Sequence, residues 1–224
     1  AKVIIGAAYG SAGERCMAIS VVVAEESIAD ELKDLLVENT KTLKIGPGDD
    51  PNIDMGPLIT LEHKQKVIRY IEEGVSAGAD LLVDGRDNHI TSQNKGFFIG
   101  PSLFDAVDQN MKIYLEEIFG PVLIIVRVKC LDEAIDLASK HKFGNGVALF
   151  TSKGSNARDL INSVQVGMVG INVAIPVPLS FYSFGGWKES IYGSSNIYGM
   201  EGVRFYTRIK TITTKWANVK SKSS

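Results

Sequence analysis

Segments typical of strands and of helices alternate through the second half of the sequence, and this alternation limits the fold more than any other feature. Apolar, β-branched runs predict strands at residues 122–128, 147–151 and 168–173, and amphipathic spacing predicts helices at 131–141 and 156–164. Strands that alternate with helices of about 10–15 residues indicate crossover connections and a mostly parallel sheet. We therefore predict a three-layer α/β fold, in which helices cover both faces of the sheet.

The first half continues the alternation less regularly. Small residues predict a helix at 2–12, and the run AISVVVA predicts a buried strand at 18–24. A helix with Ser27 at its N-cap should follow at 27–41. The other expected elements are a Gly/Pro/Asp-rich loop at 46–60, a helix at 60–78, a short strand at 81–83, a polar loop at 85–96, a Gly/Pro/Ser-rich stretch at 176–202 and a β-prone segment at 206–216.

Size and charge exclude several classes of protein. With 224 residues, of which 45% are hydrophobic and 22% charged, the chain is long enough to bury about 70% of its surface. A net charge of −2 gives no long-range attraction for nucleic acid or an anionic membrane. No apolar run reaches the roughly 18 residues that suggest a membrane span. We therefore expect neither nucleic acid nor a membrane as a partner.

The cysteines and histidines are too few for a structural framework. Two cysteines cannot make a set of disulfides, and three widely separated histidines argue against a zinc site. We expect no metal. Low cysteine usage favours a reducing compartment, which would be a bacterial cytoplasm or a mitochondrial matrix.

Two catalytic patterns fail on their context. GVSAG at 74–78 fits the G-x-S-x-G nucleophile elbow, but a helix precedes it and a strand follows it, which is the inverse of what that elbow needs. We interpret Ser76 as a helix-end residue. GNG at 144–146 lacks the third glycine of a dinucleotide-binding loop, so the chain carries no such fingerprint.

Three segments remain as candidates for chemistry, each with a structural alternative. Cys16 lies between a helix and a buried strand, where a thiol can face a cleft, although most lone cysteines are buried and inert. EEIFGP at 116–121 leads into a strand and could also be a helix-end acid followed by a turn. FGGWK at 184–188 could bring backbone and rings close to a ligand or form only a tight turn.

These segments, in this order, resemble the aldehyde dehydrogenase superfamily. GERC at 13–16 matches its Gly-x-x-Cys nucleophile segment, and EEIFGP at 116–121 matches its cofactor segment residue for residue. FGGWKES at 184–190 matches its late Phe-Gly-Gly-x-Lys-x-Ser turn, and DMGPLI at 54–59 also belongs to the family. The resemblance covers essentially the whole chain, and four motifs in order make it specific.

Within the superfamily, ERCMA at 14–18 and GINVAIPVPL at 170–179 are similar to the acylating branch that oxidises malonate and methylmalonate semialdehydes. FYT at 205–207 and KTIT at 210–213 point to the same branch. The resemblance implies NAD as cofactor, coenzyme A as co-substrate, and acetyl-CoA or propionyl-CoA with carbon dioxide as products. A non-acylating aldehyde dehydrogenase is the alternative within the superfamily.

The resemblance also implies roles for individual residues. Cys16 would be the nucleophile that forms a thiohemiacetal and then an acyl-thioester. Glu117 would bind the nicotinamide ribose, and Phe119 would pack near the nicotinamide. Phe184 would line the substrate tunnel. Arg15 would bind the substrate carboxylate, because an arginine fork suits a carboxylate bidentately; its structural alternative is an ordinary surface residue.

Relatives carry an NAD-binding domain before the nucleophile, and the resemblance implies that this chain lacks that domain. We expect residues 1–202 to be a catalytic domain without its first strand, 203–218 an oligomerisation strand and 219–224 a loose tail. The chain alone should then neither bind NAD stably nor turn over aldehyde.

A free oligomerisation strand would be an exposed sheet edge, so we expect a homodimer or homotetramer. Two alternatives from other classes stay open: a non-enzymatic oligomerisation module, and a thiol transferase that uses Cys16 without NAD. A module without NAD would have no use for Glu117 and Phe119, which favours the dehydrogenase.

Overall fold

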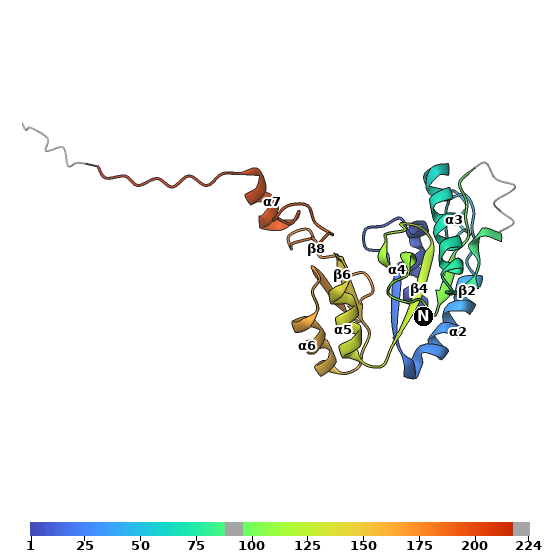
Figure 1. The fold of residues 1–224 in the computed structure, drawn as a ribbon. Coiled ribbons are helices and arrows are strands. Elements are labelled where there is room, and N and C mark those ends of the chain that lie inside the picture. The colour runs from blue at the N-terminus through green and yellow to red at the C-terminus, as the bar shows by residue number, and fades with distance from the viewer. Residues whose placement is uncertain (88–95, 217–224) are drawn as a thin grey trace, which may run out of the picture.

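The computed structural model describes residues 1–87 and 96–216 and places a four-stranded sheet at the centre of the fold (Figure 1). The strand order is β1-β4-β3-β2. Strand β1 (Val21–Glu25) and strand β3 (Ser102–Asp105) both run parallel to the central strand β4 (Val122–Val128). Strand β2 (Asp80–Val83) pairs antiparallel to β3 at one edge. The prediction of an α/β fold with a mostly parallel sheet is confirmed.

Helices cover both faces of this sheet. Every residue of β4 from Val122 to Val126 is buried, which requires cover on both sides. Helix α2 (Glu26–Lys41) contacts all four strands. Helix α1 (Lys2–Tyr9) and helix α3 (Leu61–Ser76) complete the main core with the short helix α4 (Lys112–Leu115).

Local signals explain where some of these elements begin. Thr60 caps α3, because its hydroxyl accepts a hydrogen bond from the backbone N–H of His63. The predicted cap at Ser27 is wrong: β1 passes directly into α2, and Ser27 lies inside the helix with its hydroxyl donating to Glu25. The strand predicted at 18–24 begins at Val21, three residues later than expected. A tight turn closes at Ala18, whose N–H donates to the Arg15 carbonyl, and residues 18–20 connect this turn to the strand.

A second, smaller unit follows the main sheet along the chain (Figure 1). Helix α5 (Leu131–Lys140) and helix α6 (Gly154–Ser163) alternate with the parallel pair β6 (Gly146–Leu149) and β7 (Met168–Ile171). Its core consists of Ile135, Leu160, Val164 and Val166. A two-residue antiparallel pair, β5 (Phe143–Gly144) and β8 (Trp187–Lys188), joins the loop of residues 184–190 to this unit. We call this loop the late loop. Two 3₁₀ turns, at Gly10–Gly13 and Gly85–Asp87, complete the secondary structure of the described residues before α7.

The C-terminal segment leaves the body of the molecule (Figure 1). Helix α7 (Gly199–Tyr206) takes in the first four residues of the predicted oligomerisation strand, and residues 207–216 have no regular secondary structure. A β-prone segment pairs only when a second strand is available, and none of the strands in residues 1–87 and 96–216 pairs with this one. Residues 88–95 of the predicted polar loop and the predicted tail at 219–224 lie outside the described residues. Within residues 1–87 and 96–216, no helix is long and apolar enough to cross a bilayer.

One polar cluster ties α2 to the sheet. The Arg127 guanidinium on β4 donates to both oxygens of Asp105 at 2.6 and 3.2 Å and to Asp30 of α2 at 2.8 Å. Burial raises the pKa of the Asp105 carboxyl, but the hydrogen bonds from Arg127 and from the Ala106 N–H outweigh burial and hold that pKa below its ordinary value. The hydrogen bond from Arg127 also lowers the pKa of Asp30.

We predict that Arg127→Met lowers the free energy of unfolding at pH 7 by roughly 2 kcal/mol, because it leaves the buried Asp105 carboxylate without its partner. A carboxyl with a lowered folded pKa stabilises the protein above its unfolded pKa of about 3.9, and this contribution is lost as the pH falls through the folded pKa. The difference between the two proteins in urea unfolding should therefore shrink below about pH 4. A loss of equal size at pH 7 and pH 3 would contradict this. Lys140→Met, which removes an exposed pair with Asp136, is the control and should change stability by less than about 0.5 kcal/mol.

Candidate functional site

Cys16 lies at the tip of a tight turn with its side chain exposed. The turn closes where the backbone N–H of Ala18 donates to the Arg15 carbonyl at 3.0 Å, which leaves Cys16 and Met17 as its two central residues. Among the described residues, no acceptor lies within hydrogen-bond reach of the Cys16 N–H. The structure therefore presents both the thiol and the N–H of Cys16 without partners of their own.

The backbone before this turn is left-handed over three consecutive residues. Ser11, Ala12 and Gly13 have φ values of 53°, 54° and 73°. A side chain at Gly13 would place its Cβ 2.3 Å from the Gly120 carbonyl oxygen, so only glycine fits. This contact brings the Cys16 segment against the loop of residues 116–121, which is 100 residues away in sequence. Two of the three segments that the sequence singles out therefore lie together.

The 116–121 loop holds its two acids differently. The Tyr70 hydroxyl donates to the Glu116 carboxylate, and burial, with the bonded Glu116 adding to it, raises the pKa of Tyr70 to about 12. Glu117 is exposed, and among the described residues nothing binds its carboxylate. Phe119 has a φ of 58°, and its side chain is 37% exposed. The structure fixes Glu116 and leaves Glu117 and Phe119 free to meet a ligand.

His63 connects the two loops, and the sequence alone did not single it out. Its Nε2 lies 2.6 Å from the Phe119 carbonyl oxygen and 3.5 Å from Glu14 Oε1. Because both neighbours are acceptors, Nε2 carries the proton. Burial raises the pKa of the Glu14 carboxyl, partly offset by His63 and by the Ile59 N–H. These contacts span 45 to 60 residues of sequence, so no local pattern could reveal them.

Arg15 is committed to the backbone of α1. Its Nη2 donates to the carbonyls of Gly6 and Ala7, each at 2.8 Å, near the end of that helix. Its buried Nε has no acceptor among the described residues. The guanidinium therefore anchors the start of the Cys16 turn to α1, a role that the sequence did not predict.

The late loop is fastened to the second unit by its own motif. Lys188 Nζ donates to the carbonyls of Ser139 and His141 at the end of α5, at 3.1 and 2.7 Å, and the Ser190 hydroxyl accepts from the Gly144 N–H. Phe184 is half-buried and packs against Tyr198 with ring centroids 5.4 Å apart. Asn145 lies between this loop and the Cys16 turn. It lies against Gly186 of the loop, and its side chain donates to the Cys16 carbonyl at 2.7 Å.

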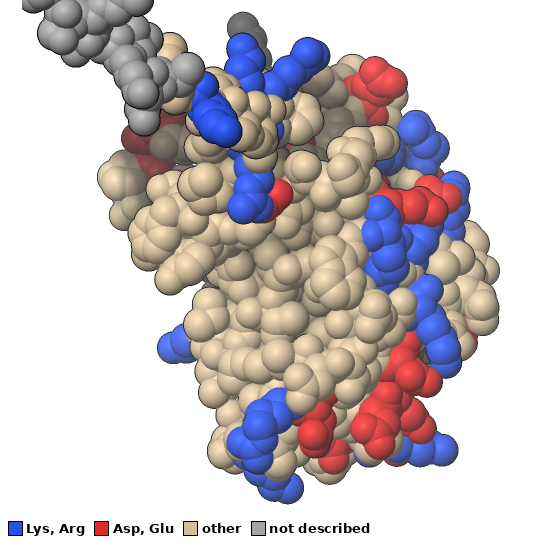
Figure 2. Space-filling view, turned by 90° about the vertical axis from the view of Figure 1, so that its left-hand side faces the viewer, with Lys and Arg blue, Asp and Glu red and all other residues tan. Residues whose placement is uncertain are grey.

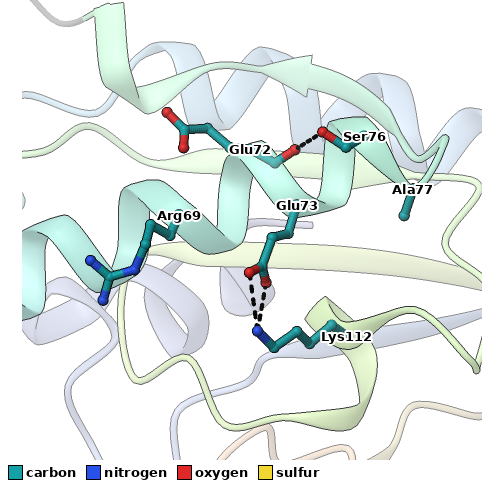
Figure 3. A pocket seen from close by; sticks show the side chains of 6 residues that line it. All are labelled: Arg69, Glu72, Glu73, Ser76, Ala77 and Lys112. Carbon is teal, nitrogen blue, oxygen red and sulfur yellow. Dashed lines mark hydrogen bonds and ion pairs between the residues drawn. The ribbon is translucent and has the colours of Figure 1, made fainter.

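The rejected G-x-S-x-G pattern forms the end of a helix. Ser76 ends α3 and donates to the Glu72 carbonyl, and strand β2 follows, so its interpretation as a helix-end residue is confirmed. A shallow cleft of about 570 Å³ lies beside it (Figure 3), lined by Arg69, Glu72, Glu73, Ser76, Ala77 and Lys112. Glu73 is paired with Lys112 there, and none of the predicted site residues lines the cleft.

The described part of the chain contains no cluster of three or more potential metal ligands.

Comparison with known proteins shows the family of the chain. The aldehyde dehydrogenase family profile matches residues 1–212. The chain belongs to the aldehyde dehydrogenase family. It is 53% identical over 214 residues to a malonate-semialdehyde dehydrogenase from Pseudomonas aeruginosa; the aligned region covers 95% of this chain and 43% of that relative. A Bacillus pumilus malonate-semialdehyde dehydrogenase is 48% identical, over 96% of this chain and 44% of the relative.

Solved structures of aldehyde dehydrogenases have the same fold. A putative methylmalonate-semialdehyde dehydrogenase from Sinorhizobium meliloti, complexed with NAD, superimposes with a TM-score of 0.94 at 50% identity, over 96% of this chain and 44% of that one. A betaine aldehyde dehydrogenase from Staphylococcus aureus in complex with NAD⁺ superimposes at 0.87 and 29% identity, over 99% and 44%. The chain thus spans less than half the length of the relatives it matches.

We predict that Gly13→Ala destabilises this aldehyde dehydrogenase chain by at least about 2 kcal/mol, because the new Cβ meets backbone and the φ is positive. Gly48→Ala is the matched control: it is exposed, has open space around its Cβ and lacks a positive φ, so its effect should stay within about 0.5 kcal/mol. Urea unfolding midpoints measure both. Equal midpoints for the two variants would contradict the close approach of the two loops.

Proposed function

We propose that this chain is the C-terminal catalytic portion of an NAD- and CoA-dependent dehydrogenase that oxidises malonate or methylmalonate semialdehyde. The products are acetyl-CoA or propionyl-CoA with carbon dioxide. One observation carries the proposal: an exposed Cys16 thiol lies on a turn that packs, through Gly13, against the loop bearing Glu117 and Phe119. The names of the relatives support this substrate class.

Cys16 starts the reaction. Its thiolate attacks the aldehyde carbon, forms the carbon–sulfur bond and converts the carbonyl into the oxyanion of a thiohemiacetal. The Cys16 N–H has no acceptor among the described residues, so it is available to donate to that oxyanion. Loss of the hydride then leaves an acyl-thioester on Cys16.

Two groups in the 116–121 loop fit the cofactor. The exposed carboxylate of Glu117 is an acceptor suited to ribose hydroxyls, and the exposed ring of Phe119 offers an apolar face to a nicotinamide. When bound, NAD supplies the hydride acceptor. We do not expect this chain alone to bind NAD stably, because it spans less than half the length of the relatives it matches.

Coenzyme A serves as the acyl acceptor. Before that transfer, the carbon–carbon bond to the substrate carboxylate breaks and carbon dioxide leaves; the electron pair forms the enolate of the thioester, and the α-carbon takes up a proton from water. The thiol of coenzyme A then loses its proton and attacks the thioester carbonyl, the Cys16 thiolate leaves, and the acyl group passes to the new sulfur. Phe184 lines the path of the substrate. Arg15 binds the substrate carboxylate through Nη1, because Nη2 already donates to α1 and Nε is buried.

We predict that iodoacetamide labels Cys16 faster than Cys130 near neutral pH in the folded chain, because we propose Cys16 as the nucleophile of the reaction. Cys130 is a matched reference, since it is also an exposed free thiol. Peptide mass spectrometry reports both rates in one sample, and the urea-unfolded chain should show equal rates. Slow, equal labelling of the folded chain would contradict the proposal.

The same assay tests the substrate class. Malonate semialdehyde should protect Cys16 from labelling by forming the thiohemiacetal, and propanal, which has no carboxylate, should protect it less. Equal protection would contradict carboxylate recognition by Arg15.

We further propose that the chain forms a homo-oligomer through its C-terminal segment. Residues 207–216 are exposed throughout, including Ile209 at 93% and Trp216 at 87%. Apolar side chains held in water favour burial against a partner. Figure 2 shows a broad uncharged area at the centre of one face, with Lys, Arg, Asp and Glu gathered at its margins.

We predict that light scattering gives a mass of at least twice 24.3 kDa for the chain. Deleting residues 207–224 should give a monomer, because the segment that pairs between copies is gone. A clean monomer of the intact chain at high concentration would contradict the proposal.

A further inference from the structure

Asn145 lies between β5 and β6 and reaches the Cys16 turn across 129 residues of sequence. Its Nδ2 donates to the Cys16 carbonyl at 2.7 Å and contacts Met17 Sδ at 3.1 Å. We propose that Asn145 is a positioning residue for the Cys16 nucleophile, which it holds through the central peptide of the turn. The inference rests on the proposed role of Cys16.

The bonded carbonyl belongs to the part of a tight turn that moves most readily. Type I and type II turns differ by a flip of the peptide between the two central residues, which changes ψ of the first by about 150°. In this turn that peptide joins Cys16 to Met17, and Met17 does not have the positive φ of a type II turn. A hydrogen bond to the Cys16 carbonyl therefore keeps the peptide in one orientation.

Asn145 can hold the turn because its own position is fixed. Its backbone carbonyl accepts from the Met168 N–H at 3.1 Å, and the preceding Gly144 carbonyl accepts from the Gly167 N–H at 2.9 Å. Its Oδ1 lies against Gly186, where an added Cβ would approach it to 3.1 Å. The amide is thus placed by the β6–β7 pair on one side and by the late loop on the other.

Cys16 is consequently held from both directions along the chain. Arg15 binds the carbonyls of α1 before it, and Asn145 binds the carbonyl after it. Fixing the backbone on both sides fixes the direction of the Cα–Cβ bond that carries the thiol, while the thiol itself stays exposed. A nucleophile that must attack with a defined geometry requires this arrangement.

The side chain of asparagine suits this task better than its isosteres. It offers two uncharged donors, one for the carbonyl and one for the thioether. Aspartate at the same place would set a carboxylate oxygen against the Cys16 carbonyl oxygen, and leucine would offer no donor. Both substitutions preserve the approximate shape while removing the hydrogen bond.

The test compares Asn145→Leu, Asn145→Asp and the control Met17→Leu in the full chain. The first readout is the rate of Cys16 alkylation by iodoacetamide across about pH 6–9, with Cys130 as internal reference. The second is ¹⁵N relaxation dispersion at the residue 17 amide, which detects exchange on the microsecond to millisecond scale. Met17→Leu removes the sulfur contact and keeps the bond to the Cys16 carbonyl.

We expect both Asn145 variants to lower the limiting alkylation rate of Cys16 at high pH by roughly 3- to 10-fold, as for the loss of one hydrogen bond, with the Cys130 rate unchanged. Dispersion should appear at residue 17 in both, and Met17→Leu should match the wild type. Circular dichroism checks that each variant folds, and Asn145→Asp decides the matter if Asn145→Leu does not fold.

Wild-type Cys16 rates and flat dispersion in a folded Asn145 variant would overturn the inference. So would a Met17→Leu variant that reproduces the Asn145 effects, because packing around Met17 would then be responsible. If wild-type Cys16 reacts no faster than Cys130, the proposed function fails instead, and the dispersion data still decide whether Asn145 holds the turn.

Discussion

The site depends on a contact between two stretches of backbone in which neither partner has a side chain. Gly13 lies directly against the Gly120 carbonyl, and an added Cβ there would come within 2.3 Å of the oxygen. Only a glycine in the left-handed region lets the Cys16 segment approach the 116–121 loop this closely. The segment that carries Cys16 and the loop that carries Glu117 and Phe119 lie against each other because of this approach.

Several polar side chains near the site donate to backbone carbonyls of other elements, both at helix ends and in loops. Arg15 binds carbonyls of α1, Lys188 binds those at the end of α5, and Asn145 binds that of Cys16. His63 does the same for the left-handed Phe119. Each of these hydrogen bonds joins a side chain to the backbone of another element, and thereby fixes the position of that backbone.

The sequence predicted regular elements better than it predicted contacts. The strand expected at 122–128 matches β4, and the helix expected at 131–141 matches α5 within one residue, because each has a strong apolar pattern. Strand β3 was missed, since four residues are too few to show a period. The β-prone segment at 206–216 has the composition of a strand, but no strand among the described residues pairs with it, and composition alone does not reveal whether a partner exists.

At the candidate site, too, the sequence pointed to residues but not to the contacts between them. Motif resemblance singled out Cys16, Glu117 and Phe119, and the structure brings their loops together through the contact of Gly13 with Gly120. The roles of these residues, and those of Arg15 and Phe184, remain predictions. His63 and Asn145 carry no local signal, because each acts on a backbone atom more than 50 residues away.

Side chains at the candidate site differ in whether they have partners within the described part of the chain. Of the groups proposed to meet substrate or cofactor, Cys16, Glu117 and Phe119 are exposed, and nothing in the described part of the chain binds the Cys16 thiol or the Glu117 carboxylate. Arg15 is already bonded to α1, and Phe184 is half-buried against Tyr198. The sequence neighbours of Cys16 and Glu117 are held: Arg15 by α1, and Glu116 by Tyr70. Rigid neighbours reduce the entropy that the reactive groups lose on binding a ligand, and the absence of internal partners leaves those groups no competing bond to break. Within both motifs, a residue whose side chain is bonded therefore stands next to one whose side chain has no partner in the described part of the chain.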